Sequence, residues 1–329
     1  MNSNFITIDR ASGIPLVGSL AFGIIDRGSS LIQVRPSSAC NMKCTFCSTS
    51  ANDLVLHPVN YTIDPDYLVA WVKEIATFKR KLHVNIDSVG EPMAYQHLLD
   101  LIHKLALLPE VYFISMQTNG TLLNEETIGA LEKAGLRRIH LSLHSLDEHL
   151  SRKLFGNEHY SLPKVLHAVE LLQSSKIEVL LAPVWLPKVN DKDIIALIQF
   201  AKKRSLRIAI QKYEVYRYSR KEKDARKTNF FYFYQQLTRW EREFGIHLVY
   251  HAKDLEVYPA PRLPEVFRVG EIVRGIVTAP GWMTGQMLCA AKNRSITVVH
   301  CNSRVGDRIT VRVLATNHNI YLAEMVKNV

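Results

Sequence analysis

Apolar residues recur along the chain in two alternating periods, one typical of helices and one typical of strands. After Asp64 and Pro65, apolar side chains follow at intervals of three and four residues up to Phe78, which predicts a helix capped by Asp64. Residues 81–87 form a short β-rich run ending in a Ser-Val-Gly-Glu-Pro loop, which predicts a strand. The same patterns predict further strands at 31–34, 111–116, 138–143, 177–181 and 206–210, and further helices at 98–108, 124–135, 161–174 and 191–204, the last capped by Asp191.

Six alternating strand and helix units predict an α/β fold with a parallel sheet. Ligands of such folds bind at the carboxyl ends of the strands, where a cysteine-rich loop (40–47) and Gly90-Glu91-Pro92 both fall. Six units are two short of a closed eightfold barrel, so an incomplete (β/α)6 TIM-like barrel would leave a lateral opening for a large substrate. An open doubly wound sheet is the alternative, but no G-x-G-x-x-G motif follows any strand, which disfavours a dinucleotide site.

The pattern changes after residue 250. Three prolines between 251 and 267 indicate a linker. Short β-rich runs with Gly-bearing turns follow, and they predict a small all-β barrel. We therefore expect four parts: an N-terminal extension (1–28), an α/β core (29–215), a basic and aromatic helical extension with the proline-rich linker (216–267), and the barrel (268–329).

The charge is strongly basic, with 41 Lys and Arg against 31 Asp and Glu, a formal net charge of +10. Such an excess favours a polyanionic partner such as nucleic acid, although a merely basic enzyme is the alternative. The barrel carries eight Lys or Arg and three Asp or Glu, hence +5 in under a fifth of the chain. Residues 217–227 carry six basic side chains against two acids, and we expect them to contact phosphates. Five aromatic residues follow at 230–234, and we expect them to be buried in a core helix.

Three cysteines, Cys40, Cys44 and Cys47, lie within eight residues in a C-x3-C-x2-C arrangement. Thiolate is the soft ligand that iron-sulfur clusters take, and three cysteines leave one iron of a cubane open, as a reactive centre requires. The alternatives are a zinc knuckle completed by a distant residue such as His57, or buried reduced thiols. Structural zinc sites usually pair two C-x2-C hooks, and only one is present.

The cysteine usage indicates a reducing compartment, because five cysteines with three clustered do not form a disulfide framework. The apolar stretch 13–25 contains a proline and lacks a basic leader. A membrane helix needs about 18 apolar residues, and a secretory signal needs that leader. We therefore expect a cytoplasmic protein without a membrane partner.

The cysteine spacing, with Phe46 directly before the last cysteine, resembles the signature of the radical S-adenosylmethionine (SAM) enzymes. The resemblance covers about residues 30–212 and implies a [4Fe-4S] cluster on Cys40, Cys44 and Cys47, with the open iron chelated by SAM. It further implies reductive cleavage of SAM to a 5′-deoxyadenosyl radical, with a low-potential electron donor such as ferredoxin or flavodoxin.

The loop after the second predicted strand of the core resembles the second motif of this family. Gly90, Glu91 and Pro92 match the G-G-E-P motif that receives the methionyl amine of SAM, with Val89 in place of the first glycine. By the same resemblance, the strand-end residues Asn119 and Ser142 would contact SAM, and Val184 would pack against its adenine.

The barrel sequence is similar to the TRAM domain, an OB-like RNA-binding barrel of several tRNA- and rRNA-modifying enzymes. Val269-Gly270-Glu271 near its start, 306–313 and 318–324 carry the resemblance. The resemblance implies RNA binding. We expect phosphate contacts from five basic residues and stacking from Trp282 or Tyr321. The five are Lys292, Arg294, Arg304, Arg308 and Arg312.

Cys289 and Cys301 lie in the same barrel. Some radical SAM RNA methylases use two additional cysteines, one to carry a methyl group and one to resolve the adduct. Small buried thiols are common in barrel cores, and the structural role is the one we expect.

The combined pattern predicts a radical SAM enzyme that modifies RNA, with tRNA ahead of rRNA. The sequence assigns no catalytic residue beyond the cofactor ligands. One alternative is a radical SAM enzyme that acts on a protein or a small molecule. The other is an RNA-binding protein with a structural metal site.

Overall fold

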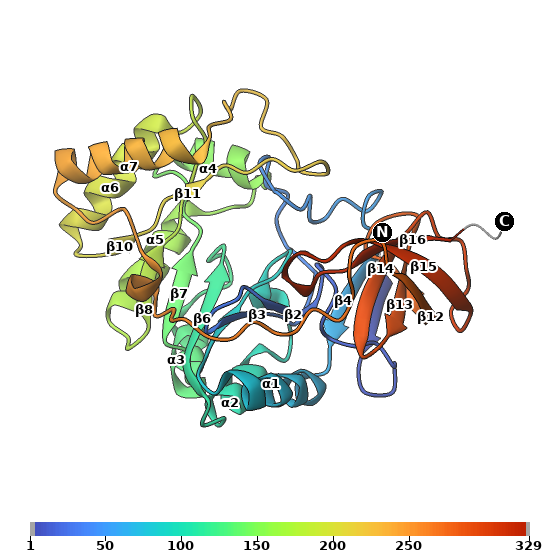
Figure 1. Cartoon of the computed structure of the whole chain (residues 1–329). Helices are drawn as coiled ribbons and strands as arrows, with labels where there is room; N and C mark the ends of the chain where they lie inside the picture. The colour runs from blue at the N-terminus through green and yellow to red at the C-terminus, as the bar shows by residue number, and fades with distance from the viewer. Residues whose placement is uncertain (1–3, 327–329) are drawn as a thin grey trace. The chain divides into compact units, whose positions relative to one another are not determined.

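The computed structural model describes residues 4–326, shown in Figure 1, and divides them into two compact units. Unit 1 comprises 4–40, 52–113 and 257–326, and unit 2 comprises 41–51 and 114–256. Each unit is therefore assembled from segments that are distant in the sequence.

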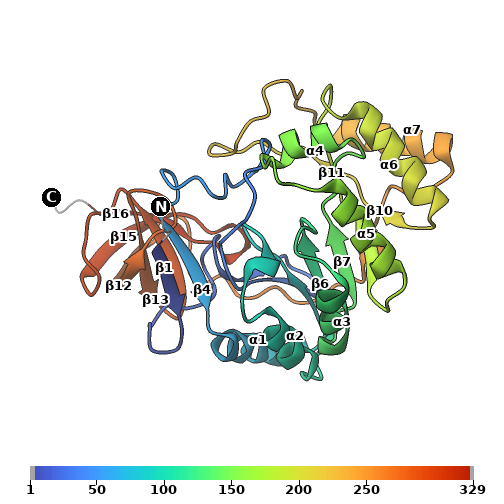
Figure 2. The ribbon, with the colours of Figure 1, turned by 180° about the vertical axis from the view of Figure 1, so that it is seen from behind.

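Unit 1 contains the first part of the α/β core. Its elements are β1 (Asn4–Ile8), β2 (Gly23–Asp26), β3 (Leu31–Arg35), β4 (Val59–Ile63), α1 (Pro65–Lys79), β5 (Leu82–Ile86) and α2 (Leu98–Ala106). Strand β3 pairs in parallel with β5 and antiparallel with β2. Helices α1 and α2 lie side by side in both views of the ribbon (Figures 1 and 2). Asp64 caps α1 as predicted, because its carboxylate accepts a hydrogen bond of 2.8 Å from the Tyr67 N–H.

Unit 2 contains the second part. Strand β6 (Val111–Thr118) leads into it, and the other strands are β7 (Arg138–Leu141), β8 (Glu178–Leu181), β9 (Val184–Trp185), β10 (Arg207–Ile208) and β11 (Gln211–Lys212). Strands β6, β7, β8 and β10 pair in parallel in that order. The helices are α3 (Glu125–Ala134), α4 (Glu148–Phe155), α5 (Leu162–Gln173), α6 (Asp191–Lys203) and α7 (Phe230–Phe244), with α6 and α7 side by side in both ribbon views.

The predicted alternation and parallel pairing are confirmed, and two details differ. Helix α4 was not predicted, although its caps, Asp147 and Gly156, are visible in the sequence. Asp191 does not cap α6: its carboxylate instead accepts hydrogen bonds from the Trp185 indole N–H at 2.6 Å and the Lys188 N–H at 2.9 Å. The N-cap position belongs to Asn190, whose side chain is used elsewhere.

The expected burial of the aromatic run 230–234 is wrong for four of its five residues. Only Phe233 is buried, together with Leu237 and Trp240 on the inner side of α7. The other rings are exposed because they lie off that stripe of residues three and four apart. Among residues 4–326, no helix combines the length and the apolar character that a membrane span requires.

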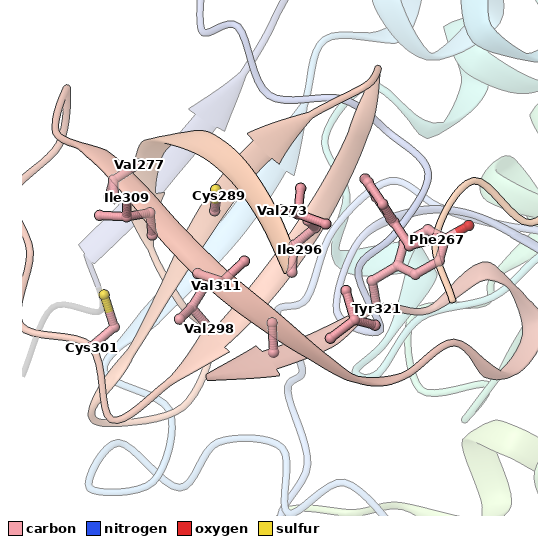
Figure 3. Packing of buried hydrophobic residues seen from close by; sticks show 12 residues of the cluster. Phe267, Val273, Val277, Cys289, Ile296, Val298, Cys301, Ile309, Val311 and Tyr321 are labelled. Carbon is pink, nitrogen blue, oxygen red and sulfur yellow. The ribbon is translucent and has the colours of Figure 1, made fainter. Parts of the chain in front are cut away.

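The predicted barrel forms and closes. Its strands are β12 (Ile272–Pro280), β13 (Gln286–Ala291), β14 (Arg294–Val299), β15 (Arg308–Ala315) and β16 (Leu322–Met325), closed in the order β12-β13-β14-β16-β15. Figure 3 shows its apolar core, with Cys289 within the cluster and Cys301 at the end away from Phe267 and Tyr321. Tyr321 is fully buried and Trp282 is 5% exposed, so neither expected stacking residue presents its ring to solvent.

The barrel packs directly on other parts of unit 1 through β14. Ser295 donates from its hydroxyl to the Pro15 carbonyl at 2.6 Å and from its N–H to the Val17 carbonyl at 2.9 Å. Gly18 must be glycine here, because a Cβ would lie 1.9 Å from the Ser295 carbonyl oxygen and its φ is +133°. This side of the barrel is therefore covered by the chain itself.

Candidate functional site

The cysteine loop is fixed in unit 2 by the end of α4. The Lys43 N–H donates to the Phe155 carbonyl at 3.1 Å, and the Thr45 N–H donates to the Leu154 carbonyl at 2.9 Å. Gly156 ends the helix at φ +58°, and a Cβ there would lie 2.2 Å from the Lys43 carbonyl oxygen. The unpredicted helix thus sets the path of the backbone around Cys44.

A second clamp on the same loop comes from residues 218–220. The Arg220 N–H donates to the Cys47 carbonyl at 2.9 Å, and its guanidinium contacts the carbonyls of residues 44, 50 and 51. The Ser219 hydroxyl donates to the Ser48 carbonyl at 2.9 Å, and the Ser50 hydroxyl donates to the Tyr218 carbonyl at 2.5 Å. Arg220 was expected in a phosphate-binding run, and the structure places it against the loop backbone instead.

Phe46 anchors the loop in a small apolar cluster with Leu154, Leu186 and Tyr213. Its ring meets the His144 ring edge-on, with centroids 4.8 Å apart. Burial lowers the pKa of His144 to about 3, so this imidazole is neutral at physiological pH. The Phe46 ring of the loop therefore packs against an uncharged imidazole.

His144 in turn positions Val184, the expected adenine contact. The Val184 N–H donates to His144 Nδ1 at 3.0 Å. The fully buried Asn190 amide donates to the carbonyls of both residues at 3.0 Å and accepts from the Leu186 N–H at 2.7 Å. These bonds explain why the Asn190 side chain does not cap its helix, and they identify Asn190 as a positioning residue.

In unit 1, Gly90 and Glu91 lie against the backbone that leads into Cys40. The Glu91 N–H donates to the Ala39 carbonyl at 2.8 Å. A Cβ on Gly90 would lie 2.0 Å from that same oxygen, so only glycine permits the approach. Glu91 is 2% exposed, and one carboxylate oxygen accepts from the Met93 N–H at 3.0 Å, at the start of the 3-10 helix Pro92–Ala94.

Asn119 is joined to the residue that follows Cys40. Its amide donates to the Asn41 side-chain oxygen at 2.7 Å, and its own oxygen accepts from the Thr121 hydroxyl at 2.6 Å. Asn41 also donates to that hydroxyl at 2.9 Å, which closes a three-residue network. Ser142 is half-buried at the end of β7, where its N–H bonds to the Thr118 carbonyl at 2.9 Å.

Residues 52–57, just after the cysteines, are fixed by the barrel. Thr284 donates from its hydroxyl to the Val55 carbonyl at 2.6 Å and from its N–H to the Leu56 carbonyl at 3.0 Å. His57 stacks on Trp282 with centroids 3.7 Å apart and rings inclined by 15°. Both rings are buried, and this stack gives His57 a packing role.

The donor set of the loop fits an iron-sulfur cluster. Cys40, Cys44 and Cys47 are each partly exposed, and none of the five cysteines, all within the described chain, forms a disulfide. In residues 4–326 no three His, Cys, Asp or Glu side chains are drawn together as a bound metal ion would require. The fit therefore rests on three partly exposed thiols within eight residues of one clamped loop.

The outer face of β12 and β15 forms a second candidate site, a basic face. Arg274, Arg308 and Arg312 are exposed on these two paired strands. Ile272 pairs with Arg312 and Ile276 with Arg308, and both isoleucines are also exposed. Arg274 was not among the expected RNA contacts, but its alternation with buried neighbours along β12 could have revealed it.

The other expected RNA contacts divide into two groups. Arg304 is exposed, like Arg308 and Arg312. Lys292 is exposed but pairs with Glu271 at 2.9 Å, and Arg294 is only half-exposed. The sequence could not separate these groups, because the ion pair of Lys292 joins it to Glu271, a residue 21 positions earlier in the chain.

Comparison with known proteins identifies the family. The family model of the radical SAM superfamily matches residues 34–201, which is half of the chain. The chain belongs to the radical SAM superfamily. Members bind a [4Fe-4S] cluster and SAM, as the cysteine spacing implied, and this confirms the expected cofactors.

An uncharacterized protein of Methanocaldococcus jannaschii is 35% identical, and the match covers 95% of this chain and 79% of that protein. The GTP 3′,8-cyclase of Aquifex aeolicus is 27% identical over 54% of each chain, so the chain spans about half the length of that relative. The solved structure of Streptococcus suis SuiB has a TM-score of 0.54 at 18% identity, covering 74% of this chain and 51% of that one. This last likeness concerns the fold alone.

Proposed function

We propose that this radical SAM enzyme modifies RNA, and tRNA in particular. The observation that carries the proposal is the basic face of the barrel, where Arg274, Arg308 and Arg312 stand on two paired strands. Guanidinium groups bind phosphates through paired N–H donors, and small five-stranded barrels commonly bind oligonucleotides. The similarity of this barrel to TRAM domains supports the same partner.

In this proposal Cys40, Cys44 and Cys47 would hold the cluster, and SAM would bind beside it. When bound, the cluster and SAM supply a 5′-deoxyadenosyl radical that removes a hydrogen atom from the substrate. Gly90 allows its backbone to approach the methionyl amine, and Glu91 provides an acceptor for that ammonium group.

Three residues of unit 2 are further proposed contacts of SAM. Asn119, held by its bonds to Asn41 and Thr121, presents a fixed amide. Ser142 lies at the neighbouring strand end, and Val184 offers an apolar surface whose backbone is fixed by His144. Electrons would come from a low-potential donor such as ferredoxin or flavodoxin, and the cytoplasm is the expected location.

The test is mass spectrometry of nucleosides from total tRNA of a strain that lacks this protein, compared with its parent. We expect one modified nucleoside to be absent, to return with the wild-type gene, and not to return with the Cys44→Ala gene. rRNA serves as a second pool, and a loss there would move the substrate from tRNA to rRNA. Unchanged nucleosides in both pools would contradict the proposal.

A second candidate is a radical SAM enzyme that acts on a free nucleotide. The relatives over half of the chain are named GTP 3′,8-cyclases, which favours a small nucleotide as the alternative substrate. In that case the reduced enzyme would form 5′-deoxyadenosine with nucleotides alone, and Arg308→Glu with Arg312→Glu would leave the rate unchanged.

A further inference from the structure

Exposed aromatic rings are concentrated in residues 216–239 of unit 2, which comprise the loop before α7 and most of that helix. Six aromatic residues of this segment are 44% to 69% exposed, an unusual concentration for a surface without a partner. They are Tyr216, Tyr218, Phe230, Phe231, Tyr232 and Tyr234. We call residues 216–239 the aromatic-basic surface.

These exposed rings are not needed to hold α7 in place. The helix packs through Phe233, Leu237 and Trp240, and the Asn229 side chain caps it by accepting from the Tyr232 N–H at 2.9 Å. Phe231 is the most exposed of the six at 69%. The rings therefore have a surface role rather than a packing role.

The charge of the same surface favours an anionic partner. Its exposed basic residues outnumber its exposed acids six to one, because Glu222 is buried and Asp224 is the one exposed acid between 216 and 239. The six are Arg217, Lys221, Lys223, Arg226, Lys227 and Arg239. The Lys212 ammonium also lies over the Phe230 ring, 4.7 Å from its centroid.

The aromatic-basic surface is continuous with the backbone of the cysteine loop. Its residues Tyr218, Ser219 and Arg220 are the clamp on the loop carbonyls described above. A ligand bound at residues 218–220 would therefore lie near the segment that carries Cys44 and Cys47.

We infer that the aromatic-basic surface binds single-stranded RNA, with unpaired bases stacked on Phe231 and Tyr232 and phosphates on the surrounding Lys and Arg. Exposed rings interleaved with cations are the arrangement that binds single strands, because every base has a face to stack and duplexes hide theirs. This inference rests on the proposed RNA substrate. It adds that the aromatic-basic surface binds an unpaired loop or end of that RNA.

The test measures binding of a fluorescein-labelled 12-nucleotide RNA strand and of the matching 12-base-pair duplex to the full chain. We expect the wild type to prefer the single strand. Phe231→Ala with Tyr232→Ala should weaken single-strand binding about tenfold or more, because both substitutions remove a ring on which a base stacks. The slope of affinity against salt should not change, because no charge is removed.

The matched control is Phe231→Tyr with Tyr232→Phe, which keeps both rings and should keep wild-type affinity. Wild-type affinity in the double alanine variant would overturn the inference. So would a wild-type dimer that the alanine variant converts to a monomer in light scattering, since the rings would then cover a second copy of the chain.

The two proposals can fail separately. If the nucleoside comparison shows a lost modification but the double alanine variant binds the single strand normally, RNA remains the substrate and this surface is not its binding site. If the wild type binds neither strand nor duplex and no nucleoside is lost, the proposed function fails and takes this inference with it.

Discussion

The chain contains two groups of cysteines, and the structure gives them opposite environments. Cys40, Cys44 and Cys47 are partly exposed on a loop whose backbone is clamped from several sides. Cys289 and Cys301 are buried in the apolar core of the barrel (Figure 3). The same side chain thus offers a ligand in one place and fills space in the other.

The difference shows that spacing and burial carry different information about a thiol. Burial raises the pKa of Cys289 to about 11, and the neighbouring Cys301 contributes in the same direction. A thiol of that pKa is a poor nucleophile and a poor ligand at neutral pH. A methyl-carrying role for the barrel pair therefore has no support in this environment.

The largest effect is expected at the loop. Cys44→Ala removes one of three thiolates and should abolish iron loading and reductive cleavage of SAM. Iron analysis measures the iron loading, and 5′-deoxyadenosine formation measures the cleavage of SAM. Cys289→Ala is the matched control and should keep both, so loss of iron in that variant would erase the distinction between the groups.

The rate of alkylation should distinguish the loop cysteines from the barrel cysteines in a single sample. With iodoacetamide at pH 8, the loop thiols should be protected while the cluster is bound and labelled once a chelator removes it. Cys289 should react at least about a hundredfold more slowly than the cluster-free loop thiols, with or without the cluster, because it is buried and protonated. Peptide mass spectrometry reports each site, and rapid labelling of Cys289 in the folded protein would contradict its assignment to the core.

The neutral imidazole of His144, which contacts Phe46 of the cysteine loop, predicts that the stability of the protein depends on pH. His144 has a folded-state pKa of about 3, below its unfolded value, so the unfolded chain takes up the proton first. Above pH 6.5 the neutral His144 contributes its full share to the free energy of unfolding. Between pH 6.5 and 3 that free energy falls by about 1.4 kcal/mol per pH unit, because only the unfolded chain binds the proton.

His144→Asn keeps an acceptor for the Val184 N–H but removes the titrating group, so its stability should fall less steeply with acid. Urea unfolding of both proteins under anaerobic conditions at pH 7, 6 and 5 measures the difference. Equal slopes would show that the imidazole is not held neutral.

The smallest effect is expected in the barrel core. Cys289→Ala and Cys301→Ala should each lower the free energy of unfolding by roughly 1–2 kcal/mol, through lost burial and a small cavity. Urea unfolding measures the loss, and RNA binding should stay at the wild-type level. A change in modified nucleosides without a change in stability would instead indicate a chemical role for the pair.

Much of the fold followed from the sequence because it depends on local chemistry. Periodicity located the helices and the main strands, Asp64 and Asn124 marked two helix starts, and the cysteine spacing indicated the cofactor. These signals lie within one turn or one loop, where near neighbours decide the conformation. The basic barrel was also expected from its short strands and its charge.

Only the tertiary structure decided which side chains face solvent and which backbones meet. It exposed the rings around Phe231, turned Arg220 to the cysteine loop, buried Trp282 against His57, and brought Gly90 onto Ala39. Each of these depends on segments far apart in the chain, and a local pattern carries no record of such a neighbour. The sequence determined the cofactor chemistry, and packing determined which surfaces remain available to a substrate.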